Sequence, residues 1–67
     1  MKSSIRVHNL NTQSDVIKIR KIIARYEGLI AYEININRKE IQLVYDNLSV
    51  DIDEIKIYIE MNGYIII

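Results

Sequence analysis

The sequence contains no cysteine. Disulfide bonds are therefore excluded, and so is ligation by thiolate, which soft metal ions such as Cu(I) prefer. The absence of cysteine fits a cytoplasmic protein, where disulfides are rare. The sequence also lacks any run of about 18 apolar residues, so we expect no segment to insert into a membrane.

The sequence also lacks a net charge, because nine Lys and Arg residues balance nine Asp and Glu residues. Proteins that bind nucleic acid usually carry the positive excess that phosphate groups attract. We therefore expect no nucleic-acid partner.

Isoleucine is what the sequence has in abundance, and 49% of its 67 residues are hydrophobic. A chain of this length forms one domain, which we expect to span residues 1–67. Such a small domain buries only about 60% of the surface of its unfolded chain, so its core must be dense in large apolar groups. The many β-branched side chains suit strands and the buried faces of helices.

The first half of the chain changes from a strand pattern to a helix pattern. Residues 3–8 alternate, with Ile5 and Val7 on one face, which predicts a half-buried strand. Residues 16–26 place apolar side chains three and four positions apart, which predicts an amphipathic helix that ends near Gly28.

The second half repeats these signals. Residues 32–36 and 41–45 alternate on either side of a polar turn, which predicts a hairpin with one buried face. Asp51-x-x-Glu54 predicts the start of a second helix, which Gly63 ends before a last short strand at 64–67.

The predicted order of elements is βαββαβ. Two right-handed crossover units of this kind form an α+β, ferredoxin-like sandwich, with a four-stranded antiparallel sheet and two helices on one face. The first three strands alternate, which leaves the other face of the sheet to solvent.

A polar loop, Asn9 to Asp15, lies between the first predicted strand and the first predicted helix. This loop, together with Gly28, Tyr45-Asp46 and Gly63-Tyr64, has the spacing of the heavy-metal-associated domain family, which the chain resembles over nearly its whole length. That family includes copper chaperones and the N-terminal domains of metal-pumping ATPases. The resemblance implies the ferredoxin-like fold.

The loop departs from the family at its metal ligands. It usually reads Gly-Met-x-Cys-x-x-Cys in the family, whereas here Thr12 and Asp15 stand at the two cysteine positions, Asn9 at the glycine and Leu10 at the methionine. A hydroxyl and a carboxylate are poor ligands for Cu(I). The resemblance therefore implies a degenerate metal-binding domain with no cofactor.

Two interpretations of Thr12 and Asp15 remain open. Thr12-x-x-Asp15 is typical of a helix start, in which Thr12 is the N-cap and Asp15 interacts favourably with the helix dipole; such a cap contributes about 1 kcal/mol. Alternatively, Asp15, with Thr12 beside it and His8 at the end of the preceding strand, forms a weak site for zinc or another divalent metal. The alternation of the first strand places His8 on its solvent side.

Tyr64 matches a tyrosine that lies beside the metal loop in the bacterial copper chaperones of the family. Without a metal, its ring would close one end of the core and its hydroxyl would face water. Leu10 would be a hydrophobic plug under the loop.

The resemblance favours a protein-interaction or regulatory module linked to metal transport. Its binding surface would be the loop and the first helix, where Leu10, Ile17 and Tyr26 are the candidate exposed apolar residues. Lys18 and Lys21 would steer a partner by their charge, and Tyr64, beside the loop, is a further candidate. The candidate partners are a metal-transporting ATPase and a second copy of the chain. Apolar strand sequence at 29–36 and 65–67 offers sheet edges for a homodimer.

Two other classes share the βαββαβ order. RNA-recognition domains stack bases on exposed aromatic side chains of their central strands, where this chain has residues such as Arg6, His8 and Gln42. Acylphosphatases need a backbone anion cradle, but the loop Asn9 to Asp15 contains no glycine with which to build one. We therefore predict that the chain is not an enzyme.

Overall fold

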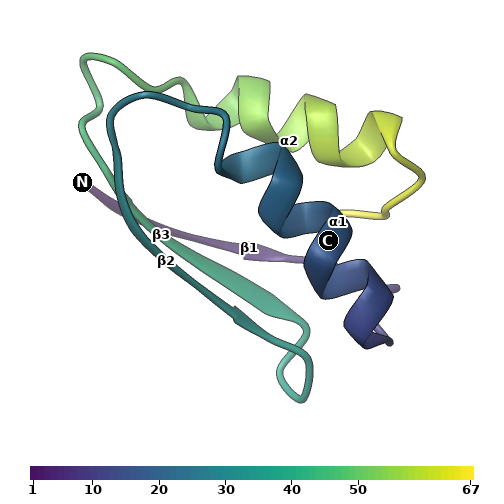
Figure 1. Cartoon of the computed structure of the whole chain (residues 1–67). Coiled ribbons are helices and arrows are strands. Elements are labelled where there is room, and N and C mark those ends of the chain that lie inside the picture. The colour runs from purple at the N-terminus through teal and green to yellow at the C-terminus, as the bar shows by residue number, and fades with distance from the viewer.

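The computed structural model describes residues 1–67 and shows a sheet whose one face is covered by two helices (Figure 1). The elements are β1 (Lys2–Arg6), α1 (Gln13–Ile23), β2 (Leu29–Asn35), β3 (Glu40–Tyr45) and α2 (Ile52–Met61). The sheet is antiparallel with the order β1-β3-β2, so β3 is central. The predicted ferredoxin-like arrangement of helices and strands is confirmed.

The predicted fourth strand is wrong, because the sheet has three strands. The segment 64–67 makes a single antiparallel bridge, between Val7 and Ile66. This bridge lies just beyond the end of β1, where the backbone is already turning into the loop. The tail is held there by hydrogen bonds from His8 N–H to the Ile65 carbonyl (2.8 Å) and from Ile67 N–H to the Arg6 carbonyl (3.1 Å).

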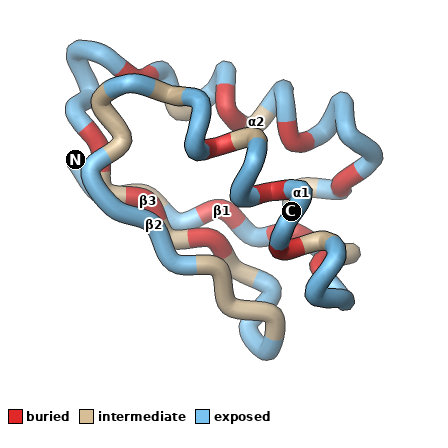
Figure 2. Tube along the Cα trace, in the orientation of Figure 1, coloured by how far each residue is buried: buried red, intermediate tan, exposed pale blue.

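Thirteen hydrophobic side chains are buried between the helices and the sheet, and no polar side chain is buried with them (Figure 2). The central strand and the two helices supply most of this core, through Val16, Ile19, Ile23, Ile41, Leu43, Tyr45, Ile55 and Ile59. Their spacing is two in the strand and three or four in the helices, as the sequence pattern predicts.

The strand β2 is less buried than its alternating pattern predicted. Tyr32 is 39% exposed and Ile34 is half-buried, while Ile36 already belongs to the turn before β3. The strand β2 lies at an edge of the sheet, with β3 as its one neighbour. A bulge between Leu29 and Ala31 further interrupts its pairing.

The helix α1 ends at Ile23, earlier than the predicted end near Gly28. Gly28 has a φ of +88° and lies just before β2, where a Cβ atom would come within 2.7 Å of the Ser49 Cβ. Gly63, with a φ of +92°, follows the C-cap of α2 as predicted. Neither helix has the length and the apolar character that a membrane crossing needs.

Candidate functional site

The loop between β1 and α1 ends in a capping box. Thr12 is the N-cap of α1, and its Oγ1 accepts a hydrogen bond from the Asp15 backbone N–H at 3.2 Å. In return, Asp15 Oδ2 accepts from the Thr12 N–H at 2.9 Å. The Asp15 N–H is thus shared between the Thr12 hydroxyl and the Thr12 carbonyl (3.1 Å), while the Asp15 carboxylate satisfies the N–H of the N-cap residue. The predicted capping role of both residues is confirmed.

The Asp15 carboxylate has two further donors. Its Oδ2 also accepts from the Asn11 N–H at 3.0 Å, and its Oδ1 accepts from the Tyr64 hydroxyl at 2.9 Å. These hydrogen bonds from Asn11, Thr12 and Tyr64 stabilise the charged form, and they lower the pKa of Asp15 from 3.8 to about 2. Asp15 is therefore a fully ionised carboxylate at neutral pH.

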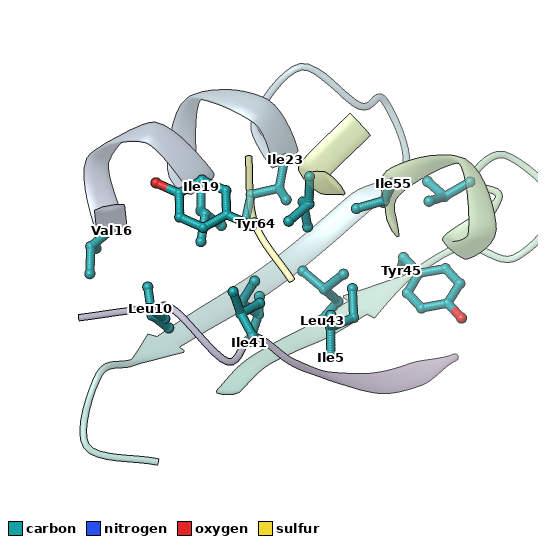
Figure 3. Close-up of a cluster of buried hydrophobic side chains, with 13 residues drawn as sticks. Ile5, Leu10, Val16, Ile19, Ile23, Ile41, Leu43, Tyr45, Ile55 and Tyr64 are labelled. Atoms are coloured by element: carbon teal, nitrogen blue, oxygen red, sulfur yellow. The ribbon is translucent and has the colours of Figure 1, made fainter. Parts of the chain in front are cut away.

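The position of Tyr64 corrects the expectation that its hydroxyl faces water. The ring is buried beneath α1, and its oxygen lies toward the end of the helix that carries Val16 (Figure 3). Burial, together with the hydrogen bond to Asp15 and its charge, raises the pKa of Tyr64 to about 12. The C-terminal segment is thereby fastened to the start of α1.

Two more side chains hold the loop, and neither was predicted to have a functional role. Asn9 Nδ2 donates to the Gly63 carbonyl at 3.0 Å, and Asn9 Oδ1 accepts from the Ile65 N–H at 2.9 Å. Lys39, in the β2–β3 turn, donates through Nζ to the His8 carbonyl at 3.0 Å and to Asn11 Oδ1 at 2.7 Å. The register of β1 on β3 pairs Arg6 with Glu40 and so brings Lys39 to the loop, and the sequence carried no signal of this pairing.

The remaining candidate residues do not share one surface. Leu10 is fully buried, which confirms it as a plug under the loop and shows that its predicted exposure is wrong. Tyr64 is also buried, and Tyr26 is half-buried. Ile17 is 43% exposed, and Lys18 and Lys21 are exposed beside it on α1. His8 is exposed, as its strand position predicted.

The loop residues do not fit a soft metal ion. Neither Thr12 nor Asp15 offers sulfur, and the Asp15 oxygens are already engaged by three donors. No group of three or more His, Cys, Asp or Glu side chains gathers anywhere in the structure. The Lys39 ammonium lies at the loop, where its charge disfavours a second cation. A divalent ion bound by His8 and Asp15 would have to displace these contacts.

No protein-family model matches the sequence, and no curated protein does. Solved structures do match. A CopZ metallochaperone superposes with a TM-score of 0.91 at 16% identity, over 100% of both chains. The N-terminal domain of a potential copper-translocating P-type ATPase from Bacillus subtilis has a TM-score of 0.88 at 15% identity, over 97% of this chain and 81% of that one. The yeast copper transporter domain Ccc2a has a TM-score of 0.87 at 26% identity, over 97% and 89%.

These likenesses establish the fold, and they confirm the resemblance that the loop and glycine spacing indicated. The chain superposes on copper chaperones and on ATPase N-terminal domains alike. It does so without any cysteine, so the two thiolates of the family motif are absent from its loop.

Proposed function

We propose that this chain is a protein-interaction or regulatory domain of metal transport that works without a bound metal. The link to metal transport is supported by the fold, which the chain shares with a metallochaperone and with a copper transporter domain. Independence from metal is supported by the chemistry of its loop.

The observation that carries the proposal is the saturation of Asp15. A metal loop must keep its ligands free to receive an ion, whereas here the carboxylate accepts hydrogen bonds from Asn11, Thr12 and Tyr64. Together with Asn9 and Lys39, these contacts join the loop to the C-terminal segment and to the β2–β3 turn. The hydrogen bonds fix the loop in one conformation, which is what a preformed binding surface needs.

The surface next to this loop is basic and partly apolar. Lys18 and Lys21 are exposed on α1, and Ile17 lies between the loop and these two cations in the sequence. Such a surface suits a partner with an acidic rim around an apolar centre, because opposite charges speed the encounter and fix the orientation. The soluble N-terminal domain of a copper-transporting ATPase from the same organism is the partner to test first.

The experiment measures binding of that ATPase domain by calorimetry in the presence of a metal chelator. We expect binding by the wild type, and loss of it in Lys18→Glu/Lys21→Glu. The matched control, Arg6→Glu/Arg38→Glu, makes the same change of charge at exposed positions outside the helices and should bind like the wild type. Binding that appears only when copper or zinc is added would contradict the proposal.

A further inference from the structure

The two helices carry opposite charges. The helix α1 contains the cations Lys18, Arg20 and Lys21 and one acid, Asp15, at its start, and Arg25 follows in the turn after it. Residues 51–60 contain the acids Asp51, Asp53, Glu54 and Glu60 and a single cation, Lys56. Both helices lie side by side on the same face of the sheet (Figure 1). The outer surface of the helix layer is therefore divided into a positive half on α1 and a negative half on α2, although the net charge of the whole chain is zero.

Apolar side chains lie within this charged surface. On α2, Ile57 is 56% exposed and Met61 is 74% exposed, and they follow Glu54 at the spacing of one helix face. Tyr58 is 40% exposed on the neighbouring row of that helix. On α1, Ile17 is exposed beside Lys18 and Lys21. Each half of the surface thus combines charge with an apolar group that could be covered by a partner.

A cleft of about 170 Å³ runs where the two halves meet. Its lining comes from both helices and from the turn after α1: Ile22, Arg25, Tyr26, Glu54, Tyr58 and Asn62. Tyr26 and Tyr58 meet edge to face across it, with ring centroids 6.3 Å apart. The Tyr26 hydroxyl is buried and has no hydrogen-bond partner within the chain.

We propose that the helix layer is a self-complementary interface and that its partner is a second copy of this chain. A two-fold axis along the cleft, parallel to the surface, places α1 of each copy over α2 of the other. The cations on α1 of each copy then face the acids on α2 of the other, so the favourable contact occurs twice in the dimer. The exposed apolar side chains of both copies are covered. An axis across the helices would instead stack α1 on α1 and α2 on α2, with like charges opposed. The inference rests on the proposed interaction role and names one partner for it.

The test uses two charge-reversed variants of the full chain, each placed on one helix. In Lys18→Glu/Lys21→Glu both helices are acidic, and in Glu54→Lys/Glu60→Lys both are basic. Each variant alone should dimerise at least about tenfold more weakly than the wild type, because four ion pairs per dimer become repulsive and exposed pairs contribute up to about 1 kcal/mol each. An equimolar mixture should recover a dimer of wild-type strength, since every reversed face then meets a complementary one.

Sedimentation velocity over a range of concentrations measures these affinities, and circular dichroism checks that each variant is folded. The control pair, Arg6→Glu/Arg38→Glu and Glu27→Lys/Glu33→Lys, carries the same net charges at exposed positions outside the two helices. Each control variant should dimerise like the wild type. Raising the salt concentration should weaken the wild-type dimer, because exposed charges are screened.

A wild type that remains monomeric at millimolar concentration would overturn the inference. A mixture that fails to recover the dimer would overturn it too, as would control variants that lose dimerisation to the same extent. The proposed function fails separately: it is refuted if the ATPase domain binds only with metal. Glu54→Lys/Glu60→Lys should still bind the ATPase domain, because that binding uses α1.

Discussion

Replacing Tyr64 with phenylalanine removes one oxygen atom and one hydrogen bond from the loop. The hydroxyl donates to Asp15 Oδ1 at 2.9 Å, and the ring that carries it is buried beneath α1. Phenylalanine fits the same apolar space, so packing should be preserved. The substitution therefore isolates the contact that ties the C-terminal segment to the start of α1.

The expected loss of stability follows from the type of hydrogen bond. A bond to a charged group contributes roughly 1.5–3 kcal/mol. Asp15 lies near the surface while the Tyr64 ring is buried, so we expect the lower part of this range or slightly less, about 1–2 kcal/mol. For a domain of this size, that corresponds to a decrease of about 5–15 °C in Tm. Urea denaturation and thermal melts at pH 7 measure both quantities.

The pH dependence gives a second readout. Asp15 has a folded-state pKa of about 2 and an ordinary value of 3.8, so its contribution to stability is present above pH 4 and is lost as the pH falls toward 2. In Tyr64→Phe the pKa of Asp15 should rise, yet stay below 3.8 because the N–H groups of Asn11 and Thr12 remain. NMR titration of the carboxyl group measures this, and the stability difference between wild type and variant should narrow as the pH approaches 2.

Tyr32→Phe is the matched control, because Tyr32 lies on the edge strand and its ring is 39% exposed. It should change stability by less than about 0.5 kcal/mol. If Tyr64→Phe has the same small effect and leaves the pKa of Asp15 unchanged, the hydroxyl does not hold the loop and the reasoning is refuted.

Two further predictions concern the backbone and the turn that contacts the loop. Gly28→Ala should destabilise the domain by about 2 kcal/mol or more in urea denaturation, because the new side chain combines a positive φ with a Cβ atom 2.7 Å from Ser49. Gly63 has a similar φ but no atom within 4 Å of such a Cβ, so Gly63→Ala should destabilise the domain about half as much. Equal losses of stability in the two variants would contradict the role given to the Ser49 contact. Lys39→Met should leave the fold intact but speed amide hydrogen exchange of residues 8–11, because it removes two hydrogen bonds to that segment; unchanged exchange would show that Lys39 does not order the loop.

Contacts between residues close in the sequence were predictable. The capping box joins Thr12 to Asp15, three positions apart, and the chemistry of that pair alone indicates it. The helix faces and the central strand follow from their apolar periods for the same reason. The buried position of Leu10 was also predictable from its place in the family loop. The competing prediction, that Leu10 is exposed on a docking surface, was wrong.

Contacts between distant residues were not predictable in this way. The hydrogen bond from Tyr64 to Asp15 spans 49 positions, and those of Lys39 to the loop span about 30. They depend on where the tail and the β2–β3 turn come to rest. The missing fourth strand has the same origin, because residues 64–67 are apolar enough for a strand but meet β1 only at its end. Alternation likewise does not reveal that β2 lies at an edge of the sheet.

The central claim is that hydrogen bonds, and not a metal ion, organise the loop from Asn9 to Asp15. NMR titration of the wild type with Zn²⁺, and with Cu(I) under reducing conditions, tests it most directly. Thr12→Cys/Asp15→Cys serves as the positive control, because it restores two thiolates three residues apart at the helix start. We expect saturable shifts in the control and none at residues 8–15 of the wild type at millimolar metal. Saturable shifts at His8 and Asp15 of the wild type would contradict the claim.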